Sequence, residues 1–393
     1  MSELTTLSAQ FSRMRRKAAE FQSVMREREI DATLLIDEDS VFYFSGYHNY
    51  LGMNYGRPSI VVIPREGEVS VILPSLEQNM ALKQTWVETI LPWTDGIGEE
   101  WRGHIKNALC GAKTVGLEYC KTHPMLRGYL QDQLPNIATV DVYYDLAQQR
   151  MVKDAGELML MRQAGEVAVA MAAGARDAIA EGVPEYEIAL ALQAAGTRKA
   201  AELLAAEDQD DFMTYSPMIW GQQIIQTGPT MHMVHKRCGL RKMRRGDSLY
   251  ACYCNITKFR GFKLGFDRQW FLGSCTDEQA EIYEQTLEAQ RIALDMIRPG
   301  VRACDVHNAA AQYLQDQGHG ICYRTGRAVG YSELEKPELR VDDETVLKEG
   351  MTFAVDGAIS LDNGIAGRVG DSVVVTKDGY EYLTKMDKAL LIL

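Results

Sequence analysis

The sequence predicts an α/β protein in two parts, a smaller N-terminal α/β domain and a larger C-terminal domain with an internal repeat. Short buried strands alternate with helical segments through the first part, which is the pattern of layered α/β domains. In the second part, the phrase IAEGVPEYEI at residues 179–188 is matched by IRPGVRACDV at residues 297–306. The composition agrees, because 46% hydrophobic and 24% charged residues are ordinary values for a globular chain.

The elements of the first part follow from hydrophobic periodicity. An amphipathic pattern predicts a helix over residues 11–28. Short apolar runs predict buried strands at residues 32–36, 59–63, 69–74, 114–118 and 138–144. From Glu157 the chain becomes rich in Ala and Met at helical spacing. We therefore expect one domain at residues 1–152 and a second at residues 153–393.

The elements of the second part occur twice. Each copy of the repeated phrase follows a long amphipathic helix, opens another helix and precedes a strand-rich region. The long helices are expected at residues 157–180 and 277–296, and the strand regions at residues 218–226 with 247–272 and at 352–376. Two such copies predict a pseudo-two-fold domain whose cleft lies on the internal axis, between the strands of two sheets.

Composition excludes several classes of function. The net charge is −12 and the basic stretch at residues 236–245 lies in an acidic chain, so nucleic acid is not an expected partner. No uninterrupted apolar run is long enough to span a membrane, and the N-terminus lacks the apolar core of a secretory signal. We expect a cytoplasmic protein. Eight dilute cysteines without paired CxxC motifs predict neither a disulfide framework nor a structural zinc site.

Four phrases point to one known family. They are RMVKDAGELMLMRQA at residues 150–164, IRPGVRACDV, GDSLYACYCN at residues 246–255 and KEGMTFAVDG at residues 348–357. Together they resemble the creatinase/prolidase/aminopeptidase P family, whose catalytic half has the pita-bread fold. The phrase TLLIDEDSVFYFSGY at residues 33–47 is similar to the N-terminal domain of the same family, so the resemblance covers nearly the whole chain.

The resemblance also locates the metal-ligand positions of the family. Most members bind two metal ions through Asp, Asp, His, Glu and Glu, and these positions hold Cys252, Gly265, Arg327, Asp356 and Gly370 here. Only one carboxylate remains to balance two divalent ions, and an arginine at the centre would repel them. We therefore expect no metal, and the chain shows no glycine-rich phosphate loop that would indicate a nucleotide cofactor.

The remaining resemblance is to the metal-free, creatinase-like branch. It implies that His235 is the general acid/base and that Asp267 and Asp356 bind the substrate cation. The phrase YGRP implies that Tyr55 and Arg57 contact the substrate, with Arg57 on its carboxylate. In that branch the N-terminal domain of one subunit reaches the cleft of the other, so a homodimer with shared clefts is expected.

Several assignments stay open at this point. His232 could replace His235 as the base, and either Arg327, as a second carboxylate binder, or His319 in the phrase GHGI could lie in the cleft. Cys252 is a candidate nucleophile if a histidine activates it. Asp267 could instead be an exposed partner of Arg268. Cys254 is expected on the opposite face of the strand and outside the site.

The sequence thus predicts a metal-independent hydrolase that cleaves a C–N bond of a small cationic or zwitterionic metabolite. A creatine-like guanidino acid or a cyclic amidine such as ectoine fits the expected residues. One alternative is a metal-dependent Xaa-Pro peptidase of the prolidase type. Another is a non-catalytic pita-bread module that binds a partner.

Overall fold

The computed structural model describes residues 3–206, 215–219, 224–254, 258–320 and 322–393. The chain divides into two compact units, an N-terminal unit made mainly of Met1–Gln149 and a C-terminal unit made mainly of residues 150–393. The division falls in the last turn of α6 (Tyr143–Met151), beside the boundary expected at residue 152. None of the helices in the described ranges combines the length and the hydropathy that a bilayer span requires.

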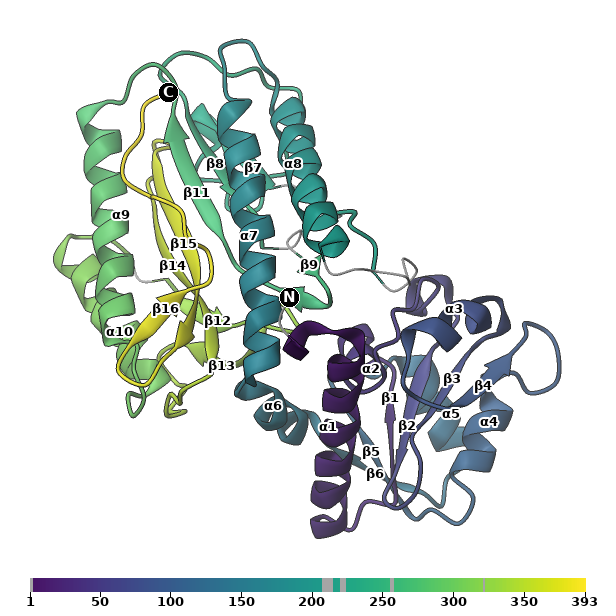
Figure 1. Ribbon diagram of the computed structural model, residues 1–393. Coiled ribbons are helices and arrows are strands. Elements are labelled where there is room, and N and C mark those ends of the chain that lie inside the picture. The colour runs from purple at the N-terminus through teal and green to yellow at the C-terminus, as the bar shows by residue number, and fades with distance from the viewer. Residues whose placement is uncertain (1–2, 207–214, 220–223, 255–257, 321) are drawn as a thin grey trace. The chain divides into compact units, whose positions relative to one another are not determined.

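The N-terminal unit is built on one mixed sheet in the order β4-β3-β2-β1-β5-β6 (Figure 1). The strands are β1 (Ala32–Leu35), β2 (Ile60–Pro64), β3 (Ser70–Pro74), β4 (Thr89–Trp93), β5 (Thr114–Leu117) and β6 (Ala138–Asp141). The helices are α1 (Leu7–Glu27), α2 (Glu38–Ser45), α3 (Gln78–Gln84), α4 (Trp101–Ala108), α5 (Pro124–Gln133) and α6. Each predicted strand is present, and β4 is an additional one.

Local capping explains where the predicted helix of this unit begins. The helix was expected from residue 11, but α1 begins at Leu7. The hydroxyl of Thr6 accepts a hydrogen bond from the backbone amide of Ala9 at 3.2 Å, so Thr6 is the N-cap and adds a turn. The predicted strand at residues 138–144 is shorter than expected, because α6 begins at Tyr143.

The C-terminal unit contains the expected internal repeat. The helices α7 (Ala155–Asp177) and α8 (Glu185–Ala205) precede the strands of the first copy, and α9 (Asp277–Met296) and α10 (Ala303–Asp316) precede those of the second. The first copy has β7 (Ile224–Thr227), β8 (Ser248–Cys252) and β11 (Asp267–Phe271), with the short β9 (Lys258–Phe259) and β10 (Phe262–Lys263). The second copy has β12 (Gly326–Ala328), β13 (Glu335–Leu339), β14 (Thr352–Ser360), β15 (Ala366–Val375) and β16 (Tyr380–Tyr382).

We expected two separate sheets, but the strands of the two copies form a single sheet. The order is β13-β12-β14-β15-β11-β8-β7, with β16 beside β15, and the neighbouring strands are antiparallel. The pair between β11 and β15 joins the copies, and its partners are Asp267 and Gly370. Residues 220–223 and 255–257, which belong to two predicted strand regions, lie outside the described residues.

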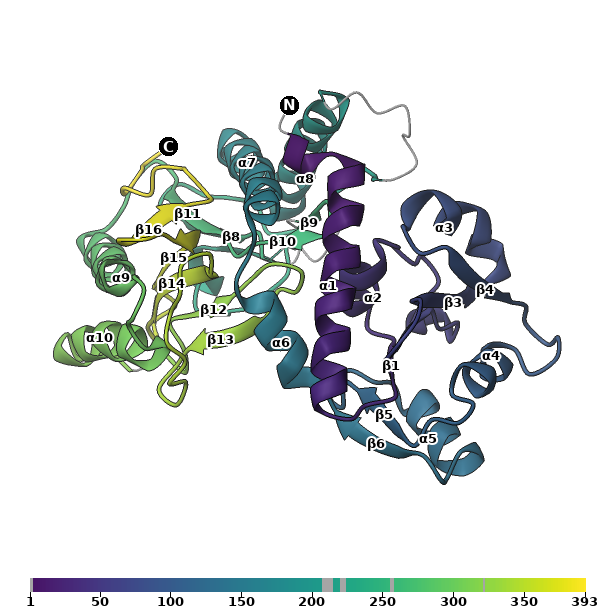
Figure 2. The same ribbon diagram turned by 60° about the horizontal axis from the view of Figure 1, so that its bottom comes forward.

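The two faces of the joined sheet have different surroundings near this pair. Helix α9 packs against β14 and β15, and Figure 2 shows α9 and α10 beside these strands. A Cβ atom at Gly357 or Gly367 would collide with Thr286 of α9, so these glycines allow a close approach of helix and sheet. Side chains alternate along a strand. Residues next to these glycines, such as Asp356 and Arg368, therefore point away from α9.

Candidate active site

The candidate site lies where the two copies of the repeat meet in the sheet. Cys252 of β8 is opposite Asp267 of β11, Asp267 is opposite Gly370 of β15, and Gly370 is opposite Asp356 of β14. Residues directly opposite each other on paired strands present their side chains on the same face. Four positions from distant parts of the chain therefore form one row across the sheet.

Gly370 lets two carboxylates of this row converge, and we call the part of the adjoining cavity that faces both of them the slot. A Cβ atom at Gly370 would lie 2.8 Å from Oδ2 of Asp267 and 2.8 Å from Oδ1 of Asp356. Both carboxylates thus lean over the glycine from opposite sides, and no larger residue fits between them. A planar cation in the cavity could donate hydrogen bonds to both carboxylates.

The row opens into a cavity of about 310 Å³, a size suited to a small molecule. Five residues that the sequence singles out line this cavity together, namely His235, Cys252, Asp267, Arg327 and Asp356. His235 is exposed, so it stands where a ligand would meet solvent. The structure thus brings together most of the predicted site within one unit.

The other expected site residues lie elsewhere. Arg57, in the N-terminal unit, forms an ion pair with Asp95 (2.7 Å between Nε and Oδ2), and Tyr55 is exposed and stacks on Tyr50. His319 is hydrogen bonded to Gln285 (2.6 Å) and does not line the cavity. Between Arg327 and His319, it is therefore Arg327 that lies in the cleft.

His232, the alternative base, is not among the residues that line the cavity. Its Nδ1 atom is buried, and among the described residues it has no hydrogen-bond partner. A histidine whose ring nitrogen is buried away from the cavity is poorly placed to exchange protons with a ligand there. Position therefore favours His235 over His232.

Burial controls the charge of the two carboxylates. Burial raises the pKa of Asp267 to about 8, Cys254 adds to the rise, and Arg327 opposes it. Burial raises the pKa of Asp356 to about 6, although Arg327 beside it acts in the opposite direction. The Nη1 atom of Arg327 is 3.3 Å from Oδ2 of Asp356. In the described part of the chain, Oδ1 of Asp356 is buried without a hydrogen-bond partner, so the slot lacks a donor on that side.

The neighbour of Asp267 in sequence belongs to a separate network on the other face. Arg268 donates to Asp371 at 2.7 Å, and both side chains are almost fully buried. Gln290 of α9 and Lys388 also donate to Asp371, at 3.3 Å and 3.0 Å. Arg268 thus has its own carboxylate. Asp267 is 7% exposed, so it is not an exposed partner of Arg268.

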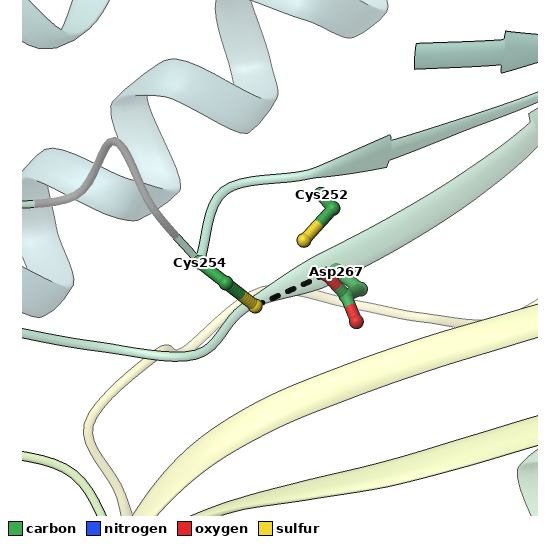
Figure 3. A group of neighbouring side chains, drawn as sticks. All are labelled: Cys252, Cys254 and Asp267. Atoms are coloured by element: carbon green, nitrogen blue, oxygen red, sulfur yellow. Dashed lines mark hydrogen bonds between the residues drawn. The ribbon is translucent and has the colours of Figure 1, made fainter. Parts of the chain in front are cut away.

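Two thiols meet Asp267 inside the cavity (Figure 3). The Sγ atoms of Cys252 and Cys254 and a carboxylate oxygen of Asp267 all lie within 4.8 Å of one another, and Sγ of Cys254 is 3.6 Å from Oδ1 of Asp267. The expectation that Cys254 faces away is wrong. Residues two apart in an extended chain share a face, so Cys254 lines the cavity together with Cys252.

The two thiols differ in acidity. The hydrogen bond from Cys252 lowers the pKa of Cys254 to about 6 against the effect of burial, and Arg327 lowers it further. The same hydrogen bond and burial raise the pKa of Cys252. If either thiol acts as a nucleophile, its electrostatic setting favours Cys254 over Cys252.

The family's two-metal site does not fit these residues. A Cβ atom at Gly265 would collide with Ala354 and would lie 3.2 Å from Nη2 of Arg327, and one at Gly370 would crowd the two aspartates. Neither position has room for a carboxylate ligand, and Arg327 places a positive charge between them. Cys252, Cys254 and Asp267 are a donor set for at most one thiophilic ion, with Arg327 close to one of its sulfur atoms.

Two basic residues of the cavity, Arg324 and Arg368, were not predicted from the sequence. Arg324 is paired with Glu338 at 2.9 Å. Arg368 stands two positions before Gly370 in β15, so strand alternation could have placed it on the same face. That no described residue forms an ion pair with it could not be seen from the sequence.

Profile and sequence comparisons place the chain among known proteins. The model of the family described as "Metallopeptidase family M24" matches residues 159–377, and the model described as "Creatinase/Prolidase N-terminal domain" matches residues 17–152. Agropine synthesis cyclase from Rhizobium rhizogenes is 28% identical and aligns over 93% of this chain and 94% of its own. Creatinase from Bacillus sp. is 28% identical (95% and 90%), and Xaa-Pro dipeptidase from Pyrococcus furiosus is 26% identical (96% and 100%).

Solved structures agree on the fold. The prolidase from Pyrococcus horikoshii superposes with a TM-score of 0.82 at 24% identity, covering 95% of this chain and 99% of its own. The X-Pro aminopeptidase from Thermotoga maritima gives 0.80 at 22% identity, covering 96% and 99%. At these identities the likeness concerns the fold, and it agrees with the expected α/β architecture of an N-terminal domain and a pita-bread domain.

Proposed function

The chain belongs to metallopeptidase family M24, and on this premise we propose that it is a hydrolase that cleaves a C–N bond of a small cationic or zwitterionic metabolite without a metal ion. The row of Asp267, Gly370 and Asp356 carries the proposal. Where the family places metal ligands, this chain has a slot bounded by two carboxylates and no side chain between them. Two carboxylates facing one cavity suit an organic cation, and two metal ions would lack most of their ligands there.

Binding of a guanidinium or amidinium ion would satisfy the groups that the free site leaves incomplete. The unpartnered Oδ1 of Asp356 and the carboxyl of Asp267 face the slot from opposite sides. The N–H groups of a planar cation could donate hydrogen bonds to both carboxyl groups. Holding the positive charge beside them would make the central carbon of the cation more electrophilic. A creatine-like guanidino acid and a cyclic amidine such as ectoine both present this group.

His235 supplies the proton transfers in this proposal. The oxygen of water adds to the electrophilic carbon while His235 accepts a proton from that water. His235 then donates the proton to the substrate nitrogen, which leaves as the C–N bond breaks. A guanidino acid would yield urea and an amino acid, and a cyclic amidine would open to an amide. Attack by Cys254 is the rival first step, because its thiol has the lower pKa of the pair.

A metal-dependent Xaa-Pro peptidase is the second candidate. The family description and the relatives named Xaa-Pro dipeptidase, which align over nearly the whole chain, favour it. Relatives named creatinase and agropine synthesis cyclase align equally well and favour non-peptide chemistry. The ligand positions separate the candidates, because Gly265, Arg327 and Gly370 offer no metal donor in their side chains.

Elemental analysis combined with a substrate panel tests the choice. We expect less than one transition-metal ion per purified chain, and turnover of guanidino acids or cyclic amidines that persists in a chelator. Xaa-Pro dipeptides, tested with added Mn²⁺ or Co²⁺, should not be cleaved. Two metal ions per chain together with chelator-sensitive dipeptide cleavage would establish the peptidase instead.

A further inference from the structure

We infer that Arg368 forms a carboxylate-binding subsite in the candidate active site, so that the ligand is a compact zwitterion. The inference rests on the proposed function for the cationic half of that ligand. Neither the family resemblance nor the sequence analysis assigns a role to this residue. Its guanidinium would hold the anionic half.

The position of Arg368 relative to the two aspartates supports the inference. Arg368 lies opposite Ala358 in β14 and two residues before Gly370 in β15, so it shares the face of the strand on which the two aspartates meet. Its Cα atom is about 7 Å from that of Gly370, at roughly 3.4 Å per residue. Arg368 also lines the same cavity as Asp267 and Asp356. A cation site and a guanidinium thus stand one strand repeat apart.

The neighbours of the Arg368 side chain include a hydroxyl group and an aromatic ring. The side chain is 8% exposed, donates to Oγ of Ser360 at 2.7 Å, and lies 5.9 Å from the ring centroid of Tyr250. Its Nε atom is buried and has no hydrogen-bond partner among the residues that the structure describes. Within the same residues, no carboxylate lies within ion-pair distance of it. A buried cation without a counter-ion is costly, so an anion would complete this site.

The other arginines of the cavity are already engaged. Arg327 donates to the carbonyl oxygen of Glu333 at 2.8 Å and pairs with Asp356, and Arg324 pairs with Glu338. Recruiting either one would disturb an existing ion pair. Arg368 is therefore the arginine of this cavity that can accept a carboxylate at the least cost.

A comparison of two ligands that differ in one carboxylate tests the subsite. Guanidinoacetate carries the anion and methylguanidine does not. Calorimetry measures both dissociation constants, and every protein compared also carries His235→Ala so that neither ligand is turned over. Protein with the native Arg368 should prefer guanidinoacetate by roughly 10- to 100-fold, the range for hydrogen bonds to a charged group. Arg368→Met should bind both ligands alike, Arg368→Lys should show a reduced preference, and Arg298→Met, an exposed control, should behave as wild type.

The outcomes separate this inference from the proposed function. A preference that persists in Arg368→Met and disappears in Arg327→Met would overturn the subsite and leave the cation slot intact. If wild type binds neither guanidine, the proposed function fails, and acetate then tests the subsite alone. Acetate should raise the unfolding temperature of wild type above that in equal sodium chloride, and should not do so in Arg368→Met; an equal rise in both would overturn the inference.

Stability provides a check that Arg368→Met is folded. Removal of an uncompensated buried charge should leave the free energy of unfolding unchanged or higher. Arg268→Met, which removes a buried arginine that forms an ion pair, should lower the free energy of unfolding clearly, because Asp371 would lose its main partner. If Arg368→Met lost as much stability as Arg268→Met, Arg368 would have a structural partner and the inference would be wrong.

Discussion

At the scale of single residues, the candidate site depends on small side chains as much as on charged ones. Gly370 lets Asp267 and Asp356 lean toward each other, and Gly265 leaves room for Arg327. The same substitutions remove the ligands that a two-metal site requires. Under the proposed function, one set of residues accounts both for the absence of metal binding and for the binding of an organic cation.

His235 is the residue on which the proposed chemistry depends most. His235→Ala should lower kcat by roughly 10²–10⁴ with little change in ligand affinity, because it removes a proton transfer and no contact with the cation. Steady-state kinetics and equilibrium binding measure the two effects separately. His232→Ala should keep kcat within a few-fold of wild type; the opposite ranking of the two variants would move the base to His232.

The stability of the ligand-free protein should depend on Asp267 in a particular direction. Its pKa is about 4 in an unfolded chain and about 8 in the folded one, so between these values the folded state binds more protons. Its contribution to stability is present at low pH and is lost as the pH rises from about 4 to about 8. Urea denaturation across this range should show the decline, and Asp267→Asn should flatten it.

Asp371→Asn is the matched control for that experiment. Asp371 is buried on the other face of the sheet and paired with Arg268 and Lys388. Its replacement should lower stability without removing the decline between pH 4 and 8. A decline that is unchanged in Asp267→Asn would show that this carboxyl is ionised throughout the range in the folded protein.

The two thiols of the site should contribute unequally to any covalent chemistry. Under the water mechanism, Cys252→Ser and Cys254→Ser should each retain most of the activity, since neither sulfur forms a bond to the substrate. Mass spectrometry of the protein during turnover should show no adduct. An adduct on Cys254 together with an inactive Cys254→Ser that still binds ligand would establish the thiolate as nucleophile.

At the scale of elements, the pair between β11 and β15 joins the two copies of the repeat and builds the site. One face of this junction holds the paired network of Arg268 and Asp371, and the other holds the slot around Gly370. Alternation along the strands thus separates a stabilising charge cluster from a binding one.

Gly370→Ala tests how closely the two carboxylates approach this junction. The new Cβ atom would lie 2.8 Å from oxygens of both aspartates, so we expect the free energy of unfolding to fall by about 1–3 kcal/mol. Urea denaturation measures it. Gly379→Ala is the matched control, because a Cβ atom there meets no atom within 4 Å. Equal free energies of unfolding for the two variants would mean that the two carboxylates stand farther from Gly370 than described.

At the scale of the whole molecule, we propose that a second subunit completes the site. Arg57 lies in the N-terminal unit, where it pairs with the half-exposed Asp95. If the partner's N-terminal unit supplies the equivalent arginine to each cleft, a mixture of Arg57→Ala and His235→Ala subunits should recover about a quarter of wild-type activity. Half of the dimers are then mixed, and one of their two sites is intact.

This complementation requires proof that subunits exchange. Light scattering should first show a homodimer, and native mass spectrometry of subunits with different tags should show mixed dimers. Activity that stays at the level of the separate variants after exchange would place Arg57 outside the shared cleft. A monomeric protein with full activity would exclude the shared cleft altogether.

Local sequence determined much of the architecture. The periodicity of residues 277–296 corresponds to α9 residue for residue, and the repeated phrases mark the two copies of the C-terminal unit. The identities of Cys252, Gly265, Arg327 and Gly370 are sufficient to argue against two metal ions, because that argument needs only the charge of each position. Residue type and short-range spacing are local properties, and they can be read without knowing the fold.

Only the tertiary structure decided which residues of the site lie together and which partners they have. That Asp267, Gly370 and Asp356 share a row depends on the register between β11, β15 and β14, which the chain sets through contacts between distant segments. That Cys254 faces the cavity, and that Arg368 finds no counter-ion among the described residues, depend on what packs around them. Charge state and partner choice follow from burial and from neighbours remote in sequence, which local patterns do not encode.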